Sequence, residues 1–219
     1  METETEFVPS NGNKRKPAVA KPSAIERAGN LTVDVVCVGA TPLLMHRFAE
    51  ASEIDGQTRA VNITRGTPRE EAEKAAYRLA DGALYLPGAG LARLIREAAG
   101  SHKQRGSRKS MKYIIGAAVL VLSETLALVD ADGKPLTEFE VDSRPVVIPS
   151  TKGRVMRHRP RLDQWGFKGR LKINQKLVQR EFVHQIVTDG GEQIGLGDYR
   201  PEKGGPYGTF RIVRWDEAV

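Results

Sequence analysis

The chain of 219 residues has a mass of 24.1 kDa, and 40% of its residues are hydrophobic, which suits one domain with an insertion or tail. Its formal net charge of +7 and pI near 9.6 favour an anionic partner. No apolar run is long enough to span a membrane, and the N-terminus has no hydrophobic signal core. Cys37, the only cysteine, excludes a disulfide within the chain and lies in an apolar run, so we expect it in the core. These features predict a cytoplasmic protein without a membrane partner.

The first elements are a tail and a strand. Residues 1–30 are rich in Glu, Lys, Pro, Asn and Ser, which predicts a flexible tail. Residues 31–38 begin with alternating polarity and end apolar, which indicates a central strand. The long stretch that follows, up to Thr67, contains no regular pattern and is typical of a functional or mobile loop.

Two helices are predicted next. The first begins at Thr67, a good N-cap followed by Pro68, and continues to about residue 80. After an extended piece over residues 83–86, the second covers residues 91–99, where apolar residues recur at helical spacing.

The C-terminal half alternates strands with one helix. We expect strands within 114–129, at 139–148, within 154–173 with a break near Gly166, and at 207–215, and a helix over 175–188 that ends at Gly190 and Gly191. This order predicts an α+β chain with a ferredoxin-like or RRM-like βαββαβ skeleton and a long insertion after the first strand. The open sheet of such folds commonly binds single-stranded nucleic acid.

Positive charge is concentrated in two stretches. Residues 101–112 hold five basic residues and no acidic one, and residues 152–172 hold eight basic residues and a single acidic one. Such concentration favours a polyanion, although solvated basic faces are the alternative. The candidate contacts in the first stretch are Lys103, Arg105, Arg108, Lys109 and Lys112.

The second stretch contains an arginine ladder. Arg154 is the first candidate contact in this stretch. An extended backbone would place Arg157, Arg159 and Arg161 on one face, at a spacing that suits successive phosphates. The alternative is a surface paired with carboxylates, but few acids lie nearby in the sequence. His158 would face the other way, in a structural role.

The segment 194–212 packs five glycines, two prolines and two tyrosines between the last helix and the last strand. Glycines allow close approach of a ligand or positive φ, so the segment suits a phosphate cradle, with a surface turn as the alternative. Tyr199, Tyr207 and Trp165 could stack on bases or anchor the core. The candidate contacts are Gly195, Gly197, Arg200, Lys203, Gly204, Gly205 and Tyr207.

The sequence shows no motif that would bind a metal or a cofactor. The four histidines and one cysteine have no ligand spacing, so we expect no metal site. Gly204-Gly205-Pro206 lacks the Lys-Ser/Thr ending of a Walker motif, and no cofactor is implied.

Three segments in this order resemble the RAMP superfamily of repeat-associated CRISPR proteins. They are Thr41-Pro42-Leu43 after the first strand, the Leu-Pro-Gly-Ala-Gly-Leu entry to a helix at 86–91, and the glycine-rich segment 195–208. The segments 67–96, 144–165 and 195–210 also resemble phage and prophage proteins.

The resemblance implies a palm domain over residues 31–219 with a thumb-like insertion at about 43–83. It also implies a homo-oligomer that holds guide RNA beside other effector subunits. Some relatives cleave RNA with an aspartate after the first strand, where Asp55 lies here.

We therefore expect a non-enzymatic protein that binds single-stranded RNA without sequence preference, as a backbone subunit of a CRISPR-type ribonucleoprotein. A phage single-stranded DNA-binding or recombination protein and a ribonuclease that uses Asp55 are the alternatives.

Overall fold

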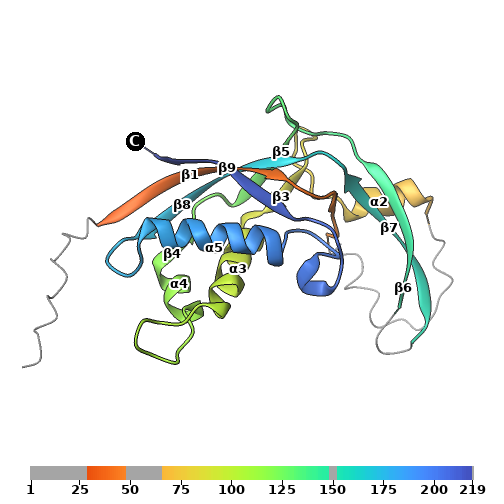
Figure 1. Ribbon diagram of the computed structural model, residues 1–219. Helices are drawn as coiled ribbons and strands as arrows, with labels where there is room; N and C mark the ends of the chain where they lie inside the picture. Colours follow the sequence, from red (N-terminus) through yellow and green to blue (C-terminus); the bar gives the residue numbers. More distant parts are fainter. Residues whose placement is uncertain (1–28, 48–65, 148–151, 219) are drawn as a thin grey trace, which may run out of the picture.

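The computed structural model describes residues 29–47, 66–147 and 152–218, and it contains two antiparallel sheets (Figure 1). The large sheet has the order β3-β5-β8-β1-β9, and β4 also pairs with β8. Its strands are β1 (Asn30–Gly39), β3 (Tyr85–Pro87), β4 (Val119–Val121), β5 (Thr125–Val129), β8 (Gly166–Asn174) and β9 (Phe210–Glu217).

The small sheet has the order β2-β7-β6 and lies beside the large one. It consists of β2 (Leu43–Leu44), β6 (Glu140–Val147) and β7 (Arg154–Leu162). The expected break near Gly166 is therefore the point where the chain passes from the small sheet into β8 of the large one.

Helices cover one face of each sheet. In Figure 1, α3 (Gly88–Ala98), α4 (Lys112–Ala118) and α5 (Arg180–Gln193) lie on the same side of the large sheet, while α2 (Pro68–Ala75) packs against β7. Two short 3₁₀ turns follow α3 and α5, namely η2 (Ala99–Ser101) and η3 (Pro201–Lys203).

The register of β1 separates a buried face from an open one. Val33 pairs with Leu171 and Cys37 with Phe167, and all four are buried under the helices. Phe167 and Phe210 meet edge to face at 5.3 Å between ring centroids, which adds a directional contact to the burial of apolar area. The core expectation for Cys37 is confirmed, and burial raises the pKa of its thiol.

The expected α+β class is confirmed. Strand β1 is followed by helix α3, strands β5 and β8, helix α5 and strand β9, but β3, α4, β4 and the small sheet interrupt this succession. The start of the expected thumb-like insertion, Leu43–Leu44, and its helix α2 both pack on β7. Residues 1–28 of the expected tail and residues 48–65 of that insertion lie outside the described ranges.

Helix α2 begins as expected and ends early. The Thr67 hydroxyl accepts from the Glu70 amide at 3.3 Å, and the Glu70 carboxylate accepts from the Thr67 amide at 2.8 Å, which forms a capping box. The helix ends at Ala75 because the Tyr77 carbonyl accepts from the Tyr85 amide and Arg78 bridges Leu84.

Three sequence expectations are wrong in detail. Residues 112–118 form α4 and not a strand, because Ile115 and Ala118 bury their side chains and the Val119 amide donates to the Ile115 carbonyl. Helix α5 begins only at Arg180, and Gly190 and Gly191 lie inside it.

The two helical glycines are required by packing. A Cβ on Gly190 would come within 2.3 Å of the Leu94 side chain, and one on Gly191 within 2.5 Å of the Phe210 carbonyl. Sequence rules treat a Gly-Gly pair as a helix end, whereas here it lets α5 approach α3 and β9 closely.

The described residues contain no helix that is long and apolar enough to cross a bilayer.

Candidate nucleic-acid interface

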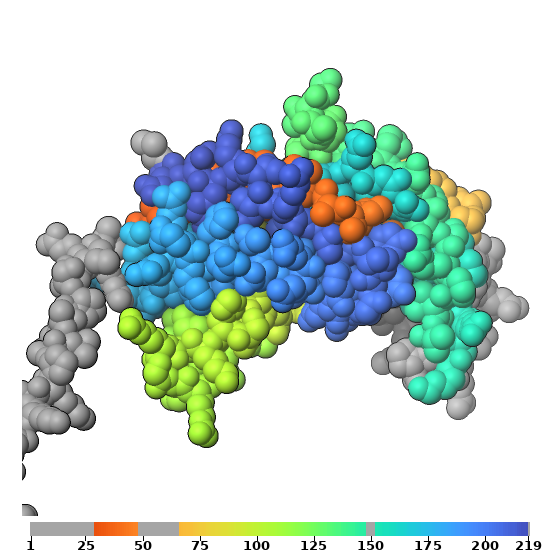
Figure 2. Space-filling view, in the orientation of Figure 1, coloured from red at the N-terminus to blue at the C-terminus, as the bar shows by residue number. Residues whose placement is uncertain are grey.

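The three predicted contact segments project from the helical side of the large sheet. In Figures 1 and 2 the loop between η2 and α4 forms one projection and the β6–β7 pair forms another, and η3 lies between them. The space-filling outline is hollowed between the two projections. Segments that are distant in sequence therefore line one side of the molecule.

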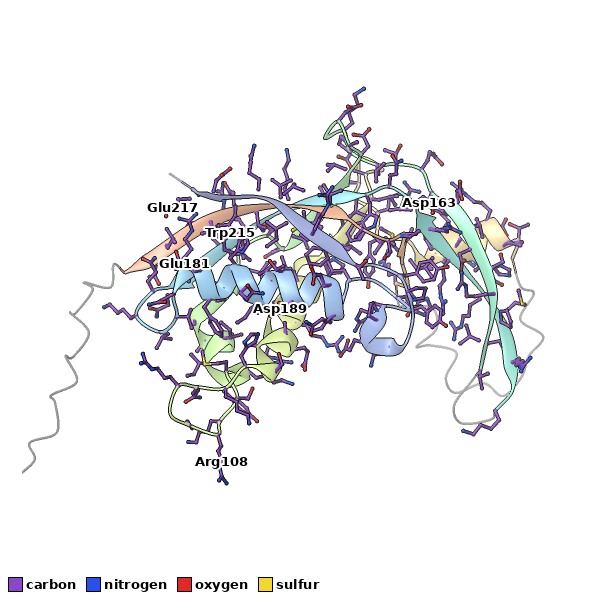
Figure 3. All side chains as sticks on the ribbon, in the orientation of Figure 1. Arg108, Asp163, Glu181, Asp189, Trp215 and Glu217 are labelled. Carbon is purple, nitrogen blue, oxygen red and sulfur yellow. The ribbon has the colours of Figure 1, made fainter. Side chains whose placement is uncertain are left out.

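The first projection is a compact basic loop. Lys103 bridges Ser110, the Gln104 amide donates to the Lys109 carbonyl at 2.9 Å, and Gly106 supplies the positive φ that the turn needs. Arg108 stands at the tip (Figure 3).

The cations of this loop differ in their surroundings. Within the described ranges, its exposed side chains Lys103, Arg105, Arg108 and Lys109 form no ion pair. Lys112 instead bonds Glu97 at 2.7 Å, which lowers the pKa of that carboxyl. Four of the five predicted cations are thus available to an anion, and Lys112 holds α4 to α3.

A histidine fixes the loop to the body. His102 Nε2 lies 3.0 Å from the Asp189 carboxylate of α5, which also accepts from the Gln185 amide group at 2.7 Å. The His102 ring meets Phe182 edge to face at 5.3 Å. This cluster anchors the base of the loop and leaves its tip in solvent.

The register of β6 and β7 places Arg157, Arg159 and Arg161 on one face, as the spacing predicts. The folded chain then brings carboxylates to two of them, Asp198 to Arg159 at 2.9 Å and Asp163 to Arg161 at 2.7 Å.

Arg159 is buried, so the expected continuous exposed ladder is wrong at its centre. Arg154 and Arg157 are exposed and make no ion pair with the part of the chain that is described. The expectation for His158 agrees with its place: it faces α2, where its Nε2 lies 3.9 Å from Glu71.

Arg144 of β6 joins the small sheet to the glycine-rich segment. Its Nε donates to Asp142 at 2.7 Å and its Nη2 to the Tyr207 hydroxyl at 2.5 Å. The guanidinium also lies over the Tyr207 ring at 4.9 Å and near the Tyr199 ring at 5.7 Å. These bonds to Asp142 and Tyr207 raise the pKa of Arg144, which remains a cation at any physiological pH.

The tyrosines and the tryptophan therefore have different environments. Tyr207 is held by Arg144, Trp165 is buried beside Phe167, and Tyr199 keeps an exposed ring. Tyr199 adopts φ 48°, a conformation that is strained for a residue with a side chain. Of the three aromatic candidates, Trp165 is excluded from base stacking and Tyr199 is the one open to a base.

The glycines of the segment 195–208 mainly serve the packing of the segment itself. A Cβ on Gly197 would come within 2.4 Å of the Leu44 carbonyl, one on Gly205 within 1.9 Å of the Tyr199 carbonyl, and one on Gly208 within 1.8 Å of the Leu196 carbonyl. A Cβ on Gly195 would come within 3.0 Å of the Gly208 carbonyl, whereas Gly204 stands in open space at φ 74°. The surface-turn alternative thus explains most of these glycines.

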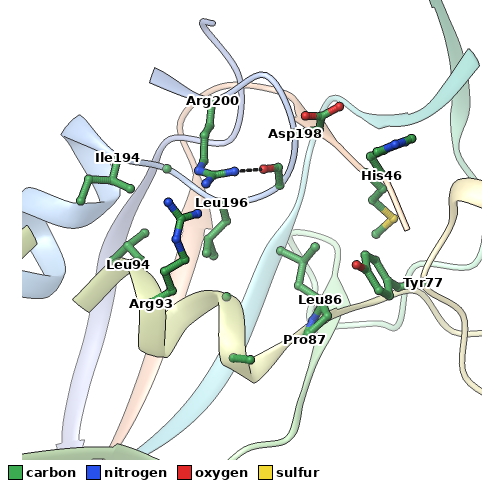
Figure 4. A pocket seen from close by; sticks show the side chains of 15 residues that line it. His46, Tyr77, Leu86, Pro87, Arg93, Leu94, Ile194, Leu196, Asp198 and Arg200 are labelled. Carbon is green, nitrogen blue, oxygen red and sulfur yellow. Dashed lines mark hydrogen bonds between the residues drawn. The ribbon is translucent and has the colours of Figure 1, made fainter. Parts of the chain in front are cut away.

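A pocket of about 450 Å³ opens between this segment and the start of α3 (Figure 4). Arg93 and Arg200 lie on one side of it, and His46, Tyr77 and Asp198 on the other. Both arginines bond Glu202, Arg93 at 2.6 Å and Arg200 at 2.7 Å, and Arg200 also donates to the Gly197 carbonyl at 2.8 Å. Arg200 is therefore a structural clamp for the segment, and Lys203 is its exposed cation.

His46 is one of the titratable groups that line the pocket. Its burial lowers the pKa, opposed by Asp198 and assisted by Arg157 and Arg159. An anion in the pocket would oppose this lowering of the pKa, because a negative charge favours the protonated form. No pattern along the chain pointed to a pocket formed by His46, Tyr77 and Arg93, since each reaches it from a different part of the fold.

The strands β1, β8 and β9 of the large sheet offer no stacking platform on their open face. Among these described strands, the outward positions carry Val, Thr, Lys, Arg and Asp and no aromatic residue. The RRM-like expectation that bases stack on this sheet face is therefore not supported by its residues.

Groups of three or more His, Cys, Asp or Glu side chains that could hold a metal do not occur in the described ranges. Asp55, the candidate nuclease residue, lies outside them.

No family profile and no curated protein matches the chain. A search of solved structures finds similarity to the crystal structure of Cmr6 from Pyrococcus furiosus, with a TM-score of 0.45 and 10% sequence identity over 84% of this chain and 99% of that one. A likeness of this degree assigns neither an activity nor a ligand to the chain.

Proposed function

We propose that the protein binds single-stranded RNA without sequence preference, along the side of the molecule from which the basic loop and the β6–β7 pair project. The observation that carries the proposal is the placement of the cations. Exposed cations without an ion pair in the described chain lie on this side at three separate points: Lys103, Arg105, Arg108 and Lys109 on the loop, Arg154 and Arg157 on β7, and Lys203 on η3. Lys168, Lys172 and Arg211 are also exposed without an ion pair in the same ranges, but they lie on the open face of the large sheet.

Electrostatics explain why such an arrangement suits a nucleic acid backbone. Unpaired cations are hydrated and surrounded by no competing carboxylate, so they can meet phosphates without breaking an internal pair. Separate clusters contact separate phosphates of one strand. Tyr199 of the glycine-rich segment has an exposed ring, which supplies a surface on which any base can stack.

The nature of the RNA rests on the sequence resemblance. The three RAMP-like segments support a guide RNA held by an oligomerising backbone subunit of a CRISPR-type effector, together with other subunits. The RRM-like palm with a thumb-like insertion is part of the same proposal. Sequencing of the nucleic acid that copurifies with the protein tests this step by itself.

Binding is tested with fluorescent poly(U) and poly(dT) oligonucleotides of equal length over a range of salt. We expect log K to fall linearly with log salt, with a slope of about −0.7 for each phosphate neutralised. Tighter binding of RNA than of DNA supports the proposal. Equal affinity or a preference for DNA points to the phage DNA-binding alternative, and a flat salt profile contradicts both.

Matched charge variants locate the surface. Replacing Arg105 and Arg108 by Gln removes two charges from the loop, and replacing Lys168 and Lys172 by Gln removes two from the open sheet face. We expect only the first pair to weaken binding and to reduce the salt slope. The reverse result would move the interface to the sheet.

A further inference from the structure

Strand β4 has a free edge that nothing in the described chain covers. Within those residues it pairs with β8 alone, through Val119↔Ile173, Leu120↔Lys172 and Val121↔Leu171. Its continuation at Leu122 is also apolar, and Leu120 and Leu122 are exposed by 59% and 42%. An uncharged apolar strand edge in solvent invites pairing with another strand.

The opposite edge of the large sheet, formed by β9, is protected against pairing with another strand. Strand β9 carries Arg211, Arg214, Asp216 and Glu217, and charges on an edge strand discourage pairing. The contrast indicates that β4, unlike β9, is normally covered.

A groove runs beside the free edge. It has a volume of about 590 Å³ and lies between α3, α4 and β4, with Ala92, Ile95, Ile115, Val119 and Val121 among its walls. On the other face of the sheet Lys172 lies directly across from Leu120 of β4, and Lys168 lies four residues away along β8; neither forms an ion pair with the described residues. A covering strand should therefore be apolar or β-branched on one side and acidic on the other.

The N-terminal sequence contains such a segment. Residues 2–7 alternate between Glu2, Glu4 and Glu6 on one side and Thr3, Thr5 and Phe7 on the other. If this part of the tail becomes extended against a sheet edge, its period of two gives it one acidic face, and Thr and Phe are good strand formers.

The chain between this segment and β1 is also long enough to reach the free edge of β4. Asn30 pairs with Asn174, and the next residue of β8, Ile173, pairs with Val119 of β4, so the start of β1 and the free edge lie at the same end of the sheet. Two strand spacings amount to about 10 Å. The 20 residues from 9 to 28 span that distance several times over.

We propose that residues 2–8 of the chain's own N-terminus pair with the free edge of β4 as an added strand, with Phe7 in the groove and the glutamates on the sheet face that carries Lys172. The pairing does not depend on nucleic acid binding, so either proposal can fail alone. Backbone hydrogen bonds hold the added strand, and alternate side chains select it.

Disulfide trapping in the full-length chain tests the pairing. Cys37 is buried, so it does not interfere with added cysteines. We combine Leu120→Cys with Glu2→Cys, Glu4→Cys or Glu6→Cys in turn, oxidise mildly, and measure bridge formation by non-reducing electrophoresis and mass spectrometry. The control replaces Leu120→Cys by Val213→Cys on β9, which is 49% exposed.

We expect one of the three Leu120→Cys pairs to oxidise within the monomer at least about tenfold faster than its Val213→Cys counterpart, since a held contact exceeds the effective concentration of a loose tether. Equal rates at the two edges overturn the proposal. Bridges between two molecules overturn it as well, in favour of a strand exchanged between copies.

Hydrogen exchange gives an independent readout. Thr5→Pro removes a strand position, whereas Ala18→Pro lies outside the proposed strand. We expect faster exchange over residues 119–122 in Thr5→Pro, with unchanged exchange over β9, and no change in Ala18→Pro. Unchanged exchange at 119–122 in Thr5→Pro contradicts the added strand.

Discussion

Arg159 of β7 and Asp198 of the glycine-rich segment form an ion pair, with 2.9 Å between Nε and Oδ2, that joins the small sheet to the segment after α5. The Arg159 side chain is only 8% exposed and Asp198 is 31% exposed. The orientation of the Arg159 Nε–H group gives no hydrogen bond, so the contact is electrostatic. It turns a residue expected in an exposed ladder into a structural link.

Replacement of Arg159 by Ala should destabilise the fold. The change leaves Asp198 without its partner and removes the packed stem of the arginine, at a cost of about 1–3 kcal/mol because one partner is partly solvated. Urea denaturation measures the free energy of unfolding. Arg157→Ala, on the same face of the same strand but exposed, should stay within about 0.5 kcal/mol of the native chain. Equal losses in the two variants would contradict a structural role for the pair.

Two helical glycines should respond oppositely to alanine. At Gly190 of α5 a Cβ would clash with Leu94 at 2.3 Å, so overpacking outweighs the gain in helix propensity and we expect a loss of about 1–3 kcal/mol. At Gly90 of α3 the nearest atom lies at 3.8 Å, so Gly90→Ala should add up to about 1 kcal/mol. The thermal midpoints check both signs. Stabilisation by Gly190→Ala would mean that α3 and α5 are farther apart than described.

His46 should make stability depend on pH. Its folded-state pKa lies below the ordinary value of 6.5 because the ring is partly buried. Above pH 6.5 both states are neutral and His46 contributes nothing. As the pH falls below 6.5 the unfolded chain binds the proton first, so stability is lost down to the folded-state pKa.

The variant His46→Gln should lose less stability over this window than the native chain. Urea midpoints between pH 7.5 and 5 measure the difference, which cancels the contributions of other groups. Parallel curves for the two proteins would contradict the assignment to His46.

Cys37 should react only after unfolding. Its thiol is buried in β1 and burial raises its pKa, so the thiolate that attacks alkylating reagents is scarce in the folded chain. We expect iodoacetamide labelling to follow the urea unfolding transition. Leu177→Cys, at a side chain that is exposed by 47%, should be labelled at once in the folded protein. Rapid labelling of Cys37 without urea would show that β1 opens locally.

Sequence patterns predicted an element correctly where the pattern depends on residues that are close together in the chain. The apolar run of β1, the capping box at Thr67 and the helical spacing of Leu91, Leu94 and Ile95 each depend on neighbours within a few residues. Such patterns report which side of an element is buried, and burial follows directly from hydrophobicity.

The errors arose where distant residues decide. Residues 112–118 form a helix because α3 and the sheet bury Ile115, and Gly190 continues α5 because α3 lies against it. The arginine ladder lost its centre because Asp198, far away in the sequence, pairs with Arg159. None of these partners can be found from spacing along the chain.

The sequence by itself determined the concentration of positive charge, the α+β order of elements and the burial of Cys37, since composition and periodicity carry that information. Only the tertiary structure decided which cations remain free. Asp198 from a remote element neutralises Arg159, and in this fold the neighbouring Asp163 and Glu202 turn towards Arg161 and Arg200. Arg108 and Arg157 stand without an ion pair in the described chain. The physical reason is that a charge is paired or free according to its neighbours in space, which folding assembles from separate parts of the chain.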